Sequence, residues 1–141
     1  MAIVPNDILD VAISLSKEPH EASKRSSVSR SYYASFHSTA SAFPEGIKPS
    51  SKASHDDLLG EVDRYARTAG SKGLKGGLTA KQIHDTLRSL KKMRKHADYE
   101  LSAVFEHRDA ENAVAKAREV LRLATKIYQI RNTPPPEEIT A

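Results

Sequence analysis

The sequence predicts an all-α protein, an up-and-down bundle of four to five helices. Apolar residues recur three, four and seven positions apart along most of the chain, which is the period of amphipathic helices. No segment shows the strict alternation of polar and apolar residues that a half-buried strand requires. Four of the six glycines fall within residues 70–77, between two helical stretches, and therefore mark a connection.

The composition limits the class of protein. The 141 residues fit a single helical domain over residues 1–132 and a disordered, proline-rich tail over residues 133–141. The net charge of +4 and the pI near 9.3 favour polyanionic partners. The absence of cysteine excludes disulfides and thiolate metal ligands. Because the chain has neither a signal-peptide pattern nor an apolar run long enough to span a bilayer, we expect a cytoplasmic protein with no membrane partner.

Caps and apolar stripes predict the first three helices. The first begins at Pro5 and ends before Pro19. A longer central helix runs from about His20 to Phe43, where a Pro-Glu-Gly segment ends it. The Ser54 hydroxyl can cap a third helix, whose first turn holds the acidic side chains that the helix dipole favours. The apolar stripe of this third helix is Leu58, Leu59, Val62 and Tyr65.

The second half of the chain predicts two more helices. Residues 70–77 (GSKGLKGG) do not suit regular structure and are expected to be mobile. Thr79 and Gln82 form a capping-box pattern that starts a fourth helix. Between Tyr99 and Asp109 the pattern is compatible with a kinked continuation of that helix. A last long helix follows, with Val114, Ala117, Leu121, Ala124 and Tyr128 on its stripe.

Arg94 stands out in the fourth helix because it falls into the apolar stripe, four residues after Leu90. The other members of this stripe are Ile83, Leu87 and Ala97. A guanidinium keeps its charge when it leaves water, so an acceptor must meet its donors. We therefore expect Arg94 to be buried and bonded to Asp98, one turn further on, or to a group on the central helix.

A basic strip lies on the opposite face of the same helix, formed by four cationic residues three and four positions apart: Arg88, Lys91, Lys92 and Lys95. Such a strip can bind the phosphates of RNA or of a nucleotide, and binding of this kind weakens as salt is added. The alternative interpretation is an ordinary solvated helix face.

On the central helix, Tyr33 and His37 follow Arg30 by three and seven residues, so the three side chains lie on one face. If this helix packs against the fourth one, these side chains converge with Arg94, Asp98 and Tyr99. That would be an unusual density of polar groups inside a small bundle, and it suggests a site for a phosphate-bearing ligand. The alternative is that His37 is a hydrogen-bonded core or surface residue.

His96 is a further candidate, two residues after Arg94. A histidine can act as general base or acid on a ribose 2′-hydroxyl, and an arginine can stabilise the pentacoordinate phosphate without a metal ion. The alternative is that His96 is a solvated surface residue. We expect no metal site and no cofactor, because neither a metal-binding motif nor a repeated histidine and carboxylate spacing is present.

Three segments together resemble the HEPN superfamily: residues 29–37 (SRSYYASFH), 52–59 (KASHDDLL) and 94–99 (RKHADY). The similarity is greatest to small HEPN proteins with an SRxYYAxFH-like helix and an RxxADY motif. It spans roughly residues 8–130 in order. The resemblance implies a HEPN-like helical bundle that forms a homodimer.

The resemblance also implies a function. Many HEPN proteins are metal-independent endoribonucleases, including toxins paired with a minimal nucleotidyltransferase antitoxin and effectors of phage defence. On that basis this chain is an RNA-directed protein of such a module, with possible ribonuclease activity, and its catalytic candidates are Arg94, His96, His37 and Asp98. The alternative is a catalytically silent HEPN subunit that binds a nucleotide, RNA or a protein partner.

The chain departs from the motif of active HEPN ribonucleases, which usually carry a histidine between one and two helical turns after the motif arginine. Asp98 and Tyr99 stand in that region here, so cleavage would need His37 or His96 to substitute in space. Tyr99 is the regulatory candidate. In HEPN toxins with a tyrosine just past the catalytic histidine, the paired nucleotidyltransferase is thought to add AMP to that hydroxyl. The alternative is that Tyr99 merely packs at the end of its helix.

Overall fold

A computed structural model describes residues 3–47 and 54–133, and every regular element within these ranges is helical. The all-α class predicted from the sequence is thereby confirmed. Residues 134–141 of the predicted tail lie outside the described residues. In chain order the elements are α1 (Pro5–Ser16), α2 (Glu21–Ala42), the short 3-10 helix η1 (Pro44–Gly46), α3 (Ser54–Ser71), α4 (Gly77–Tyr99) and α5 (His107–Asn132).

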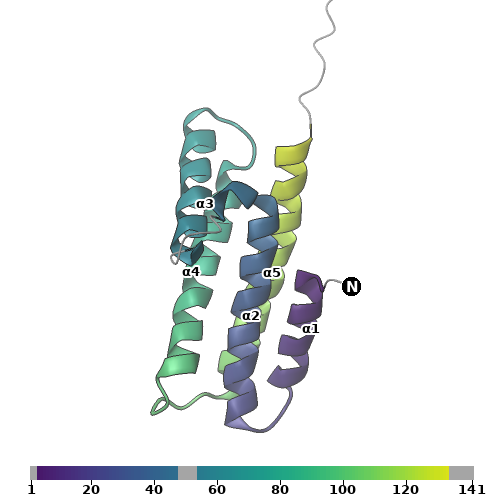
Figure 1. The fold of residues 1–141 in the computed structure, drawn as a ribbon, viewed down its shortest axis with the longest axis vertical. Coiled ribbons are helices and arrows are strands. Elements are labelled where there is room, and N and C mark those ends of the chain that lie inside the picture. The colour runs from purple at the N-terminus through teal and green to yellow at the C-terminus, as the bar shows by residue number, and fades with distance from the viewer. Residues whose placement is uncertain (1–2, 48–53, 134–141) are drawn as a thin grey trace, which may run out of the picture.

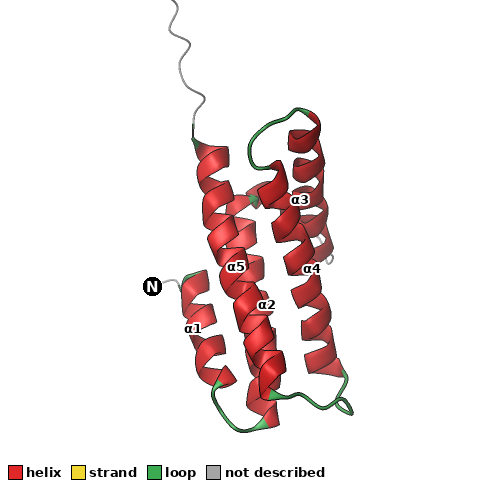
Figure 2. Ribbon diagram, turned by 180° about the vertical axis from the view of Figure 1, so that it is seen from behind, coloured by secondary structure: helices red, strands yellow, loops and turns green. Residues whose placement is uncertain are grey.

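Helix α2 is the centre of the bundle and packs against α1, α4 and α5 (Figure 1). The view from behind shows α5 running beside α2 over most of its length (Figure 2). Consecutive helices run in opposite directions, except that α3 runs in the same direction as α2 (Figure 1). Helix α3 packs on the upper half of α4, so the lower half of the α2–α4 pair extends beyond it (Figure 1).

The core is assembled from the predicted stripes of α2, α3 and α4, together with residues of α5 that lie beside its predicted stripe. Its largest fully buried side chains include Tyr32, Phe43, Leu58, Ile83, Leu87, Leu90, Leu123 and Ile127. Small side chains let α2 approach its neighbours closely, and the buried Ser27 hydroxyl donates a hydrogen bond of 2.7 Å to the Ala12 carbonyl of α1. A second apolar cluster, Leu9, Ala34, Ala117 and Leu121, joins α1 to α2 and α5.

Several predicted boundaries are wrong in detail. Helix α3 continues to Ser71, and α4 begins at Gly77 after a Gly76 cap with φ of 94°, so Thr79 is a buried residue inside the helix. Its predicted role as a cap is wrong, because the helix begins two residues earlier, after Gly76 in the left-handed conformation. The segment between α4 and α5 is a loop rather than a kinked helix. Tyr128 is 50% exposed, and Ile127 takes its place in the core.

A single arginine, Arg131, ties the ends of two helices together. Near the end of α5, Arg131 donates a hydrogen bond of 2.5 Å to the Ala42 carbonyl at the end of α2, and it pairs with Glu45 of η1. Its guanidinium lies 4.3 Å from the centre of the Phe43 ring. These contacts hold the end of α2 against the end of α5.

The large apolar side chains differ in their exposure. The aromatic residues Tyr32, Phe36 and Phe43 are buried within one chain, so they provide no argument for a dimer. Large apolar side chains are instead exposed at several other places, among them Tyr99, Leu101 and Val104 around the end of α4. Within residues 3–47 and 54–133, no helix is both long and apolar enough to cross a membrane.

Candidate functional site

Arg94 lies between α4 and α2, and its side chain is only 12% exposed. Its Nη1 atom is 3.4 Å from Oδ2 of Asp98, and the same carboxylate oxygen accepts a hydrogen bond of 3.3 Å from Ser29 on α2. The expected bond to Asp98 is thus confirmed, whereas Arg94 is partly buried rather than buried as expected. The Nε atom of Arg94 is buried and has no hydrogen-bond partner among the described residues.

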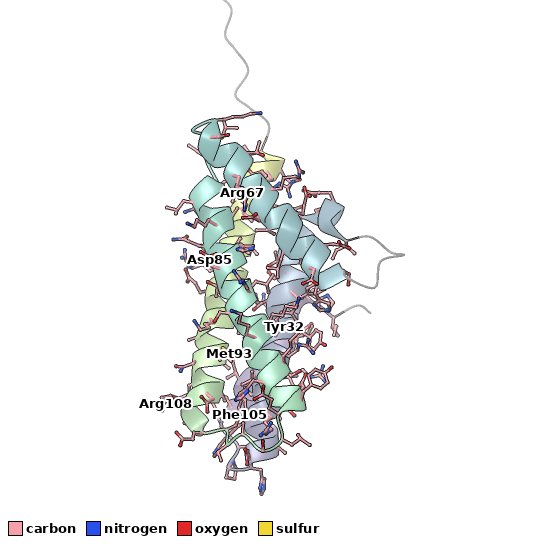
Figure 3. All side chains as sticks on the ribbon, turned by 90° about the vertical axis from the view of Figure 1, so that its left-hand side faces the viewer. Tyr32, Arg67, Asp85, Met93, Phe105 and Arg108 are labelled. Atoms are coloured by element: carbon pink, nitrogen blue, oxygen red, sulfur yellow. The ribbon has the colours of Figure 1, made fainter. Side chains whose placement is uncertain are left out.

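Three tyrosines surround the Arg94 guanidinium. Its central carbon lies 5.4 Å from the Tyr32 ring centre, 5.8 Å from that of Tyr33 and 5.9 Å from that of Tyr99. At these distances the aromatic faces stabilise the cation. Tyr32, labelled in Figure 3, projects from α2 near the point where α3 begins. The helices therefore bring Tyr33, Arg94, Asp98 and Tyr99 together, as the sequence led us to expect.

His55, at the start of α3, also belongs to this cluster, although the sequence analysis did not single it out as a site residue. Its ring stacks on Phe36 with centres 4.3 Å apart and on Tyr32 at 5.5 Å. Its Nδ1 atom forms a hydrogen bond with the Tyr32 hydroxyl. Helical periodicity cannot reveal such a contact, because His55 and Tyr32 are on different helices. The one available signal was that His55 lies in a segment carrying the family resemblance.

The surroundings of His55 favour its neutral form. Burial, with the nearby charges of Arg94 and Lys91, lowers the pKa of His55 below its ordinary value. Asp56 opposes this shift, but its carboxylate is paired with Lys91. Burial likewise raises the pKa of Tyr32, so the hydroxyl bonded to His55 stays protonated near neutral pH.

We predict that acid destabilises the wild-type protein more than it destabilises His55→Gln. Because the pKa of His55 is lower in the folded than in the unfolded state, the unfolded state binds more protons as the pH falls below about 6.5, and the fold loses stability. Glutamine cannot titrate, so this contribution disappears. Urea unfolding of both proteins at about pH 7.5 and about pH 5 measures the difference, and parallel losses in the two proteins would contradict it.

The basic strip lines a groove of about 280 Å³ between α3 and α4, together with Asp56, Leu59 and His84. Its four members are not equivalent. Lys91 is only 14% exposed and forms an ion pair with Asp56 across the groove. Arg88, Lys92 and Lys95 are exposed and have no ion-pair partner among the described residues. The positive charge available to a ligand therefore comes mainly from these three.

The remaining candidates lie apart from Arg94. His96 points toward the loop after α4, where Nδ1 lies 2.5 Å from Oε2 of Glu100 and the ring lies 5.2 Å from the centre of Phe105. His37 is exposed and contacts the edge of Phe36. Within the described residues, neither of these histidines nor Arg30 makes a hydrogen bond or ring contact with Arg94. The predicted convergence is therefore incomplete.

Arg25, which the sequence analysis did not single out, fixes the end of α4 below the site. Its guanidinium lies 4.6 Å from the centre of the Phe105 ring, and Glu21 accepts a hydrogen bond of 2.9 Å from the Phe105 backbone N–H. The Arg25 side chain donates to four backbone carbonyls, those of Ala97 (2.7 Å), Glu100 (3.1 Å), Leu101 (3.5 Å) and Ala103. We call this set of contacts the Arg25 clamp.

Metal binding has no structural support in the part of the chain that is described. Within residues 3–47 and 54–133, no three histidine, aspartate or glutamate side chains are grouped so that they could hold a metal ion. The groups that surround Arg94 are aromatic rings, hydroxyls and one carboxylate. The guanidinium carries only donors, so it suits hydrogen bonding to an anion.

Comparison with known proteins gives one match. The family model described as HEPN domain matches residues 13–128, which include all of α2, α3 and α4 and so every residue of the Arg94 cluster. No curated protein and no solved structure matches the chain significantly.

Proposed function

We propose, from the premise that the chain belongs to the HEPN domain family, that it is an RNA-directed protein of a toxin–antitoxin or phage-defence module. Members of this family cleave RNA, or bind RNA, nucleotides or partner proteins. Among these activities, RNA binding is the one that the geometry supports best.

The observation that supports RNA binding is that the basic strip and Arg94 lie on successive turns of one helix. Arg88, Lys92 and Lys95 offer exposed charge to phosphates, which release condensed counterions when they bind. Further along α4, the exposed ring of Tyr99 offers a surface on which a base can stack. A single strand that follows α4 would meet charge first and an aromatic ring afterwards.

Cleavage of RNA has less support than binding. A general base must come within hydrogen-bond reach of the ribose 2′-hydroxyl while an arginine contacts the phosphate. His96 is turned toward Glu100, and His37 contacts Phe36 rather than Arg94. This separation favours the alternative function, a catalytically silent HEPN subunit that binds RNA, a nucleotide or a protein partner.

The partner proposals rest on the family and on exposure. A homodimer is the expected assembly, and the apolar side chains of Tyr99, Leu101 and Val104 are accessible to a second chain. A minimal nucleotidyltransferase is the proposed antitoxin. Tyr99 is its proposed target, since the residue is 72% exposed and an added AMP would bring negative charge beside Arg94.

The double variant Lys92→Glu/Lys95→Glu is expected to bind single-stranded RNA at least about tenfold more weakly at low salt. Its plot of log affinity against log salt should be less steep by about two, since two phosphate contacts are lost. Fluorescence anisotropy with a labelled oligonucleotide across a series of KCl concentrations measures both quantities. Lys91 is left intact because its replacement would also leave Asp56 unpaired.

The matched control is Lys17→Glu/Lys126→Glu, which makes the same change in net charge at two exposed positions outside the strip. It should retain most of the affinity. Equal weakening in the two double variants would mean that RNA senses only net charge, and unchanged affinity in the strip variant would refute the proposal. Gel analysis of the same mixtures decides whether the RNA is also cut.

A further inference from the structure

We propose that His55 and Arg94 together bind one phosphoryl group of a nucleotide or an RNA strand, with His55 acting as a neutral hydrogen-bond donor through its Nε2–H. This inference deepens the proposed RNA binding and takes its class of ligand from it. It adds a residue from α3 to a site otherwise built from α2 and α4.

The first step concerns the proton on the His55 ring. Tyr32 is 1% exposed, and within the described residues its hydroxyl has one hydrogen-bond partner, the Nδ1 atom of His55. If Nδ1 carried the proton, the Tyr32 hydroxyl hydrogen would be buried without an acceptor, which is costly. Tyr32 must therefore donate to Nδ1. In the neutral ring the proton then resides on Nε2.

The second step concerns where the Nε2–H lies. The face of the His55 ring packs on Phe36, and its Nδ1 edge lies against the buried Tyr32. His55 is partly exposed, and its Nε2 atom has no hydrogen-bond partner among the described residues, so we infer that the exposed edge is the one that carries Nε2. The tyrosine thus fixes both the tautomer and the direction of the donor, as partners of the second ring nitrogen do in other histidine sites.

The third step concerns the position of Arg94, whose charge is close enough to His55 to influence the pKa of the histidine. The two side chains border the same pair of rings. Arg94 lies 5.4 and 5.8 Å from the centres of Tyr32 and Tyr33, and the His55 ring lies 5.5 and 6.2 Å from them. Arg94 also has N–H groups to spare, because a guanidinium carries more donors than its long contact of 3.4 Å with Asp98 and its hydrogen bond with Tyr99 use.

The charge balance around these donors favours an anion. Arg94 is the strongest positive influence on His55, whereas the charges of Lys91 and Asp56 largely offset each other in their ion pair. A phosphoryl group offers several strong acceptor oxygens to such donors. With its proton on Nε2, neutral His55 has no lone pair to present at that edge, so it cannot act there as a general base. Binding rather than cleavage follows from this tautomer.

The test begins with NMR of protein labelled with ¹⁵N-histidine at neutral pH. The His55 ring should show the Nε2–H tautomer in the wild type and should lose this preference in Tyr32→Phe, which keeps the ring but not the hydroxyl. Adenosine 5′-monophosphate should shift the His55 Nε2 resonance, whereas adenosine should not. An RNA oligonucleotide with a 5′-hydroxyl, which carries only phosphodiesters, tests the second source of phosphoryl oxygen.

Variants of His55 test whether its side chain acts as a hydrogen-bond donor to the phosphoryl group. His55→Gln can place an amide N–H near the position of Nε2, so it should bind the phosphorylated probe within about threefold of the wild type. His55→Ala should bind about tenfold more weakly, because a hydrogen bond to a charged group is lost. The control His107→Ala changes an exposed histidine on α5 and should have no effect. Circular dichroism of each variant checks whether it is folded.

The outcomes distinguish this inference from the proposed function. If RNA binds through the basic strip but His55→Ala binds as the wild type does, or His55→Gln is as weak as His55→Ala, the inference is wrong and RNA binding stands. An Nδ1–H tautomer in the wild type also overturns the inference. If adenosine monophosphate binds at His55 but RNA does not bind, the phosphoryl site stands and the ligand is a free nucleotide.

Discussion

Replacing Arg25 with alanine is expected to lower the free energy of unfolding by about 2–4 kcal/mol. The Arg25 side chain is 13% exposed, and the Arg25 clamp satisfies carbonyls at the end of α4 and in the following loop. These carbonyls have no further helical turn to supply donors. The alanine variant also loses the contact of the guanidinium with Phe105. Urea unfolding followed by circular dichroism measures the loss.

The matched control is Arg67→Ala on α3. Arg67 is also a helical arginine with a carboxylate partner, Asp63 at 2.9 Å, but its side chain is 80% exposed. Exposed ion pairs of this kind contribute at most about 1 kcal/mol, so this variant should be nearly as stable as the wild type. Similar losses in the two variants would mean that the Arg25 clamp has no special importance. Arg25→Lys should fall between them, because an ammonium group cannot reach all the carbonyls.

Gly76→Ala is expected to destabilise the protein by about 2–3 kcal/mol. Two causes act together at this position. The φ of Gly76 is 94°, which side chains of L-residues rarely adopt, and a Cβ atom would lie 2.7 Å from Cδ1 of the buried Ile127. The hydroxyl of Tyr65 would be only 3.2 Å away. Accommodating the methyl group must therefore move side chains that pack between α3, α4 and α5.

Gly73→Ala separates these two causes. Gly73 has a φ of 65° in the same loop, and a Cβ atom there would meet nothing within 4 Å. Its replacement should cost only the backbone strain, about 1 kcal/mol. The difference between the two variants then reports the packing conflict at Ile127. Equal unfolding free energies for both variants would show that the close approach at Gly76 is relieved without cost.

The sequence predicted those features that depend on neighbours along one helix. The stripe through Leu87 and Leu90 correctly placed Arg94 on the inner side of α4, and the spacing of four residues gave its bond to Asp98. The same periodicity led to an error at Tyr128, because in a long helix a shift of one position exchanges a core residue for an exposed one. Periodicity thus gives the buried face more reliably than its edges.

The features that were missed depend on contacts between distant segments. The Arg25 clamp joins residues more than 70 positions apart, and no local pattern marks an arginine that binds carbonyls of another helix. The contact of His55 with Tyr32 depends on where the connection after η1 places the start of α3. His96 was a candidate because it follows Arg94 by two residues, on a different side of the helix, yet Glu100 and Phe105 turn it toward the loop.

The two arginines at the helix ends bear on how the bundle opens. Helix ends normally fray at little cost in free energy, ahead of global unfolding. Here the last turn of α4 is held to α2 through Arg25, and the end of α2 is held to α5 through Arg131. Fraying at either end must therefore break contacts that also support the core. The last turn of α4 carries Asp98 and Tyr99. Because this turn is already ordered, binding of a ligand there costs the protein little conformational entropy.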